Sequence, residues 1–297
     1  MTSDRAISAC GTASPQTAGE LKNSPCREHG PGNNACHVPA HFPSCGQPHG
    51  SGKATQIIPV VHWAVRPGAG DIRTVVIDAG HGGKDPGCSG SNSREKHIAL
   101  AVAQGLAARL KAQHSGLQVI LTRDEDVFIP LYERAAIANR AHADLFVSIH
   151  CNYMPGSSAT RGSETYIMGL HTANHNLAVA KRENEAIRLE ENYEQNYDYD
   201  LNSPEGHILL SMYQSAYLER SVRFAEKVEH HFHATAERKS RGVKQAGFVV
   251  LKETAMPSAL VEIGFLSSGE EETFLLSAEG QDRVADALAA AFADYKR

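Results

Sequence analysis

The stretch from Thr74 to Gly87 constrains the fold of this chain more than any other. It begins with an apolar, β-branched run, Val75–Ile77, and breaks into the glycine-rich turn Gly80-His81-Gly82-Gly83. Such a run is typical of a buried strand, and the glycines let the backbone turn sharply where the strand ends. Open α/β sheets usually place their ligand sites at the carboxyl ends of strands. His81 is therefore a candidate metal ligand or catalytic base, although a loop histidine is more often a solvated surface residue.

Strand and helix patterns alternate after residue 71. The expected strands are 73–79, 118–121, 144–151, 164–168, 247–251 and 258–265, and the expected helices are 94–110, 131–141, 181–191, 205–238, 269–277 and 279–296. Ser93 is the expected N-cap of the first helix, and Glu95 lies in its first turn, where a carboxylate suits the helix dipole. The alternation predicts an α/β sandwich with a mostly parallel sheet.

Residues 1–70 have a different character from the predicted domain at 71–297. Prolines punctuate them and hydrophobic periodicity is absent, so they are expected to form a disordered tail. Only residues 56–65 are apolar enough to pack, as an edge strand of the domain. The tail holds four of the six cysteines and several histidines, but their irregular spacing argues against a zinc site there.

Charge and hydropathy exclude several classes of protein. The net charge of −5 argues against nucleic acid as the main partner. No apolar run approaches the length of a transmembrane helix, and no signal peptide is readable at the N-terminus. The glycine-rich turn does not match a nucleotide-binding loop, because Lys84 is followed by Asp85 and not by Ser or Thr.

Two more polar residues interrupt apolar strands. His150 ends one strand, and Glu262 sits inside another. A buried carboxylate without partners is costly, so Glu262 is either functional or paired, with Arg123 or Lys252 as candidate partners. Two histidines and one carboxylate form a common catalytic zinc set, which leaves the fourth position for water. Glu95 is the best third ligand beside His81 and His150.

Several separated motifs, in this order, carry a resemblance to a known family. They are Val76–Gly87, Arg94–Lys96, Leu121–Arg123, Val147–Asn152, Arg161–Gly162 and Leu260–Phe265. Together they closely resemble the zinc-dependent N-acetylmuramoyl-L-alanine amidases of the type 3 amidase family, over about residues 72–296. The resemblance implies a sheet of about six strands flanked by helices.

The same resemblance implies site residues and an activity. The zinc ligands would be His81, Glu95 and His150, the catalytic glutamate Glu262, and the supporting or substrate-binding residues Asn152 and Arg123. The substrate would be peptidoglycan, cut at the amide between N-acetylmuramic acid and L-alanine of the stem peptide. Zinc would activate water and Glu262 would act as general base and then acid. The expected roles are cell-wall remodelling and daughter-cell separation in the cell envelope, periplasmic or extracellular.

An insert at about 171–245 is similar to the helical insertion of division-associated amidases. In those proteins a helix blocks the zinc cleft until an activator protein displaces it. Glu183 and Glu185 are the candidates to occupy the open zinc position, and for each the alternative is a solvated helical face.

Two alternative functions and one unusual residue accompany this interpretation. The alternatives are another zinc peptidase of related fold acting on wall peptides, and a non-catalytic wall-binding protein, against which the retained Glu262 argues. Cys151 stands where the family that the chain resembles commonly has a small residue. Because side chains alternate along a strand, Cys151 is expected to point away from the face that carries His150.

Overall fold

A computed structural model of the chain describes residues 72–169, 173–192 and 217–297. The predicted tail at 1–70 and its edge strand at 56–65 lie outside these ranges. So do the middle of the predicted insert and the first part of the expected helix at 205–238. No helix in the described ranges combines the length and the apolar character that crossing a membrane requires.

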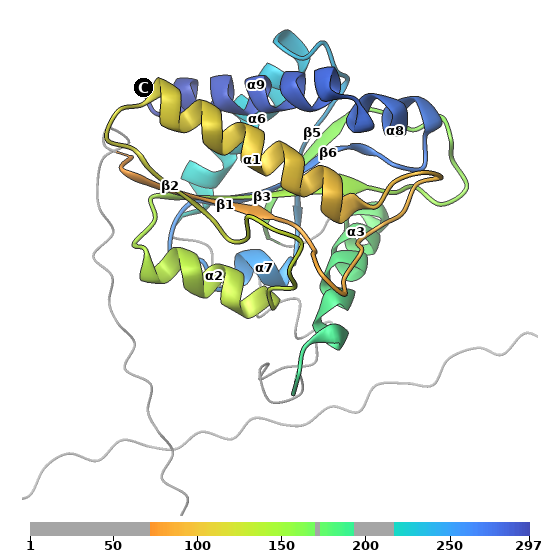
Figure 1. Ribbon diagram of the computed structural model, residues 1–297, viewed down its shortest axis with the longest axis horizontal. Coiled ribbons are helices and arrows are strands. Elements are labelled where there is room, and N and C mark those ends of the chain that lie inside the picture. The colour runs from red at the N-terminus through yellow and green to blue at the C-terminus, as the bar shows by residue number, and fades with distance from the viewer. Residues whose placement is uncertain (1–71, 170–172, 193–216) are drawn as a thin grey trace, which may run out of the picture. The chain divides into compact units, whose positions relative to one another are not determined.

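The centre of the domain is one six-stranded sheet (Figure 1). Its strands are β1 (Thr74–Ala79), β2 (Gln118–Leu121), β3 (Leu145–Asn152), β4 (Ser163–Met168), β5 (Ser240–Ala246) and β6 (Ser258–Phe265). Their order across the sheet is β2-β1-β3-β6-β4-β5, and every neighbouring pair is parallel except β6 and β4. The predicted mostly parallel sheet of about six strands is confirmed.

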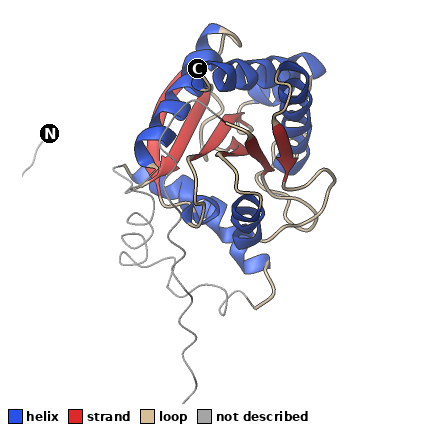
Figure 2. Cartoon of the chain, turned by 90° about the vertical axis from the view of Figure 1, so that its left-hand side faces the viewer, coloured by secondary structure: helices blue, strands red, loops and turns tan. Residues whose placement is uncertain are grey.

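Helices cover both faces of the sheet (Figures 1 and 2). The described helices are α1 (Glu95–Gln113), α2 (Leu131–Arg140), α3 (Asn174–Asn184), the 3-10 helix η1 (Glu185–Leu189), α6 (Leu218–Ala234), α7 (Val249–Lys252), α8 (Gly269–Leu276) and α9 (Ala278–Tyr295). Apolar residues of α1, α6, α8 and α9 share one core with the sheet, and those of α2, α3 and α7 share another. This two-sided burial explains why the central strands are apolar on both faces.

Side chains alternate between the two faces of the sheet along β3 and β6, and this alternation decides which face carries His150 and Glu262. In β3 the odd-numbered residues, including Cys151, belong to the core beneath α1, so the prediction that Cys151 points away from His150 is confirmed. The other face of β3 carries Phe146, Ser148, His150 and Asn152. In β6, Leu260 and Glu262 lie on that same second face, because Ala259, Val261 and Ile263 pack into the first core.

Two local predictions were wrong. Residues 247–251 do not form a strand: Val249–Lys252 is the short helix α7, and the edge strand is Ser240–Ala246. A short apolar run cannot be assigned to strand or helix by periodicity alone, and the polar, half-buried β5 has no apolar alternation to mark it. Ser93 is not the N-cap of α1: Arg94 occupies that position, and the Ser93 hydroxyl donates to Glu272 instead.

Candidate metal centre

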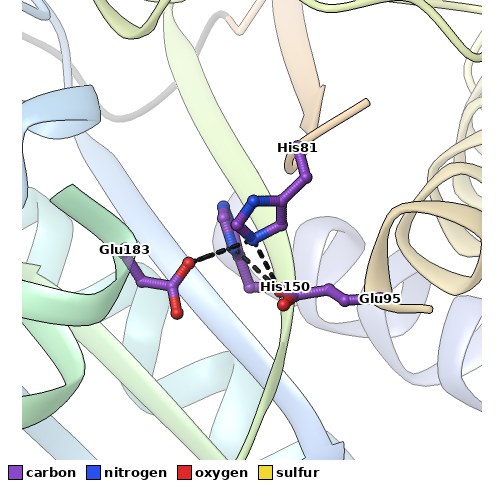
Figure 3. Close-up of side chains that lie close together, drawn as sticks. All are labelled: His81, Glu95, His150 and Glu183. Carbon is purple, nitrogen blue, oxygen red and sulfur yellow. Dashed lines mark hydrogen bonds and ion pairs between the residues drawn. The ribbon is translucent and has the colours of Figure 1, made fainter. Parts of the chain in front are cut away.

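Four side chains from four separate segments converge at the carboxyl edge of the sheet (Figure 3). His81 comes from the turn after β1, Glu95 from the start of α1, His150 from β3 and Glu183 from α3. All four are buried, and one ligand atom from each lies within 4.8 Å of the others. The Nε2 atom of His81 is 3.1 Å from a carboxylate oxygen of Glu95 and 3.1 Å from one of Glu183. The Nδ1 atom of His150 is 3.0 Å from each of the same two oxygens.

The donor atoms of this cluster fit a divalent metal ion. Within the described residues, His81 Nε2 and Glu183 Oε2 are buried and have no hydrogen-bond partner. Burial alone would lower the pKa of His150, but Glu183 and Glu95 outweigh it and raise that pKa to about 9. The two carboxylates therefore stabilise a positive charge at this point. Imidazole nitrogens and carboxylate oxygens are the ligands that zinc takes in catalytic sites.

Asp85 fixes the ring of His81. Its Oδ2 atom lies 2.8 Å from His81 Nδ1, and its Oδ1 atom accepts a hydrogen bond from the Gly87 amide. A carboxylate can only accept, so the proton of a neutral His81 ring stays on Nδ1 and Nε2 faces the cluster. A carboxylate behind a ligating histidine is a frequent arrangement in metal sites.

The Glu95 carboxylate is held by two backbone amides. The amide of Cys151 donates to Oε1, and the amide of Cys88 donates to Oε2, each over 2.8 Å. One carboxylate thus ties the turn after β1 to the end of β3, and this contact orients Glu95 toward His81 and His150.

Two glycines of the opening motif make room for these side chains. A Cβ atom at Gly80 would lie 2.5 Å from the ring of His150, and one at Gly87 would lie 2.6 Å from Glu95 and from His81. Larger residues at either position would displace the cluster. The glycine-rich turn is therefore required by the close packing of the candidate ligands.

A buried arginine supports the strained turn. His81 has φ of 60°, in the left-handed region that non-glycine residues rarely adopt. Arg134, which is 1% exposed, donates to the His81 carbonyl over 2.8 Å and forms an ion pair with the fully buried Asp78. Arg123 donates to the carbonyls of Ala79 and Gly80. These hydrogen bonds from Arg123 fix the backbone on the N-terminal side of His81.

Replacing Arg134 with methionine is expected to lower the free energy of unfolding by about 3–5 kcal/mol, because Asp78 would be left buried without its cation. Urea denaturation followed by circular dichroism measures this loss. The matched control is Arg140→Met, which removes an exposed ion pair with Glu133 and should leave the urea midpoint unchanged. An unchanged midpoint for Arg134→Met would refute the structural role assigned to the pair.

Glu262 lies beside the cluster without belonging to it. It is fully buried, and within the described part of the chain neither of its carboxylate oxygens has a hydrogen-bond partner. Burial and the nearby charge of Glu183 raise its pKa well above the usual range, while Arg182 opposes the rise. Arg123 and Lys252 were candidate partners only in the alternative interpretation of Glu262 as a paired carboxylate. The ion pair of Glu262 is with Arg182, at 3.7 Å.

The structure separates the remaining candidates. Asn152 is buried: its side chain donates to Glu164 and accepts from Arg182, each over 3.0 Å. Of the two insert glutamates, Glu183 reaches the cluster, whereas Glu185 is exposed and forms an ion pair with Arg188. Sequence reasoning missed Arg182 and Glu164.

The fold and the cluster define a class before any comparison: an α/β protein with a candidate metal-dependent hydrolytic site at the carboxyl edge of its sheet. A family model described as N-acetylmuramoyl-L-alanine amidase matches residues 75–294. The chain belongs to this family, and the resemblance read from its motifs is confirmed.

Individual proteins agree with this assignment. The chain is 34% identical to N-acetylmuramoyl-L-alanine amidase AmiA of Escherichia coli K12 over 230 residues, covering 76% of this chain and 77% of the relative. The solved catalytic domain of the amidase CwlV from Bacillus (Paenibacillus) polymyxa var. colistinus aligns with a TM-score of 0.55 and 32% identity, covering 75% of this chain and 98% of that one. The amidase AmiC2 of Nostoc punctiforme aligns with a TM-score of 0.54 and 30% identity, covering 77% and 97%.

Proposed function

We propose that this chain hydrolyses the amide between N-acetylmuramic acid and L-alanine in peptidoglycan, with one zinc ion held by His81, Glu95 and His150. The observation that carries the proposal is the buried cluster of two histidines and two carboxylates, with Glu262 beside it. We place the activity in the cell envelope, because its substrate is there, and we propose a role in cell-wall remodelling and the separation of daughter cells.

Each residue has a distinct task in the proposed reaction. His81, Glu95 and His150 would hold the zinc ion, which would supply Lewis-acid chemistry to the scissile carbonyl and to water. Glu262 accepts the proton of the attacking water and then donates it to the leaving amine of L-alanine. A buried carboxyl group beside the cluster can both take up and release a proton, which both transfers require. Asp85 keeps the His81 ring in one orientation throughout.

Metal analysis combined with product analysis tests this function. Elemental analysis should find one zinc ion per chain, and a chelator should reduce peptidoglycan hydrolysis at least about a hundredfold, with zinc restoring it. Mass spectrometry should find intact stem peptides with free L-alanine amino termini. Released single amino acids would favour another zinc peptidase, and wall binding without cleavage would favour a non-catalytic role.

We further propose that α3 holds the site closed at rest. The carboxylate of Glu183 lies 3.1 Å from the His81 nitrogen and 3.0 Å from the His150 nitrogen, where it would take the fourth zinc position. Catalytic zinc sites leave that position to water or substrate. An activator protein that displaces α3 would open it.

Three polar contacts support this closed arrangement. Arg182 donates to the Tyr153 carbonyl over 3.0 Å, and the Asn184 side chain accepts from the Val249 amide over 3.0 Å. After η1, Glu190 accepts from the Leu131 amide at the start of α2 over 2.7 Å. These contacts attach α3 to the residue after β3 and to the start of α7, and they attach the residue after η1 to the start of α2.

A further inference from the structure

A row of acidic and basic residues crosses the sheet from the metal cluster to its edge. In the register of the sheet, His150 on β3 lies opposite Glu262 on β6, and Glu262 lies opposite Glu164 on β4. Directly opposite residues share a face, so Glu164 lies next to the candidate general base, one strand farther from the metal cluster. Glu164 is fully buried.

Glu164 is an anion that gathers two cations from the edge strand β5. The Arg241 Nε atom donates to Glu164 Oε1 over 2.8 Å, and the Lys244 ammonium donates to the same oxygen. Burial alone would raise the pKa of Glu164, but these two donors and the Tyr166 hydroxyl outweigh it and lower the pKa to about 2. One carboxylate oxygen of Glu164 is therefore shared by two cationic side chains of β5.

The two cations are held in place and still have donors to offer. The guanidinium of Arg241 lies over the Phe265 ring at 5.3 Å, and the Lys244 ammonium lies over the Tyr166 ring at 5.8 Å. Their side chains are 27% and 18% exposed. A guanidinium has five N–H groups and an ammonium has three, and among the described residues the two groups donate one hydrogen bond each, both to Glu164.

We propose that Arg241 and Lys244 form a carboxylate-binding subsite for the stem peptide, on the side of the scissile amide where the peptide continues. Two strand spacings separate β6 from β5, about 10 Å, which an extended peptide covers in about three residues. Stem peptides carry carboxylates on the residues that follow L-alanine. Arg241 can bind one in a bidentate manner, and Glu164 and the two rings hold the cations ready for it. The inference rests on the peptidoglycan amide as substrate.

A pair of synthetic muramyl peptides tests the subsite, one with free side and terminal carboxylates and one with these groups amidated. The full-length chain should cleave the free form with the higher kcat/KM, by about tenfold for one charge-assisted hydrogen bond. In the Arg241→Gln/Lys244→Gln double variant this ratio should fall to about one, through a higher KM for the free peptide at unchanged kcat. The ratio does not depend on how many chains have α3 displaced, so it is independent of the proposed closure.

Controls separate recognition from folding and from the proposed function. Arg140→Gln, an exposed arginine on α2, should keep the parent ratio. Each single variant leaves Glu164 one cation, and thermal unfolding checks that the fold is kept. Calorimetry on the Glu262→Gln chain compares the dissociation constants of the free and the amidated peptide without turnover. An unchanged ratio in the double variant, or an equal loss for both peptides, would overturn the subsite. A zinc-loaded Glu183→Ala chain, which lacks the carboxylate of the proposed closure, would contradict the proposed function instead if it cleaved neither peptide nor peptidoglycan.

Discussion

Glu262→Gln is expected to lower kcat on purified peptidoglycan by about a thousandfold, within the range that general acid–base catalysis contributes. Glutamine keeps the shape of the side chain but can neither accept the proton of water nor pass it on. Zinc content should stay at one ion per chain, because the atoms of the metal cluster belong to His81, Glu95, His150 and Glu183. Elemental analysis and release of amino termini from cell walls measure the two quantities.

The control for this variant is Glu185→Gln, an exposed glutamate that pairs with Arg188. It should match the parent chain in rate and zinc content. If Glu262→Gln digested cell walls at the parent rate, Glu262 would not be the base. If it lost zinc together with activity, the separation between ligands and base would be wrong.

Glu183→Ala is expected to raise the basal rate of peptidoglycan hydrolysis about tenfold or more, with zinc retained. The substitution removes the carboxylate that would occupy the fourth position of a bound zinc ion and would leave three protein ligands, as in catalytic zinc sites. A tenfold change needs a shift of only about 1.4 kcal/mol between closed and open arrangements. The rate of the full chain without any activator measures the effect.

The substitution of Glu183 tests closure by α3 more sharply than a deletion of residues 176–215, which would remove most of α3. Val179 and Ala180 of α3 are buried in the core that α3 shares with α2 and α7, and a deletion would expose that core. Glu185→Ala, two residues along and exposed, is the matched control and should keep the parent rate. A Glu183→Ala chain that stays folded and zinc-loaded at the parent rate would argue against closure by α3.

Much of the metal cluster could be predicted before the structure. His81 and His150 stand at the carboxyl ends of apolar strands, and parallel strands bring such ends to one edge of a sheet. Glu95 is the first residue of the helix that follows the turn with His81. The short connection between the two residues therefore predicted that they lie close together. The glycines around His81 predicted a sharp turn of the backbone, and the structure shows that Gly80 and Gly87 also leave room for the side chains of His150 and Glu95.

Errors arose where local pattern and tertiary packing disagree. Residues 247–251 are apolar because one turn of helix α7 is buried, whereas β5, the true edge strand, is polar. The polar side chains of β5 form long-range contacts, which cannot be predicted from the residues next to them in the sequence. Arg241 and Lys244 pair with Glu164, some eighty residues earlier in the chain.

The sequence by itself determined the α/β class, the central strands, the candidate ligands His81, Glu95 and His150, and the place of Glu262 inside an apolar strand. These features follow from side-chain periodicity and short connections, which act over a few residues. Only the tertiary structure decided that Glu183 and not Glu185 enters the cluster, and that Glu262 faces Arg182. Those outcomes depend on how α3 is rotated against β3 and β6, and that rotation is set by packing between segments that are about thirty and about eighty residues apart.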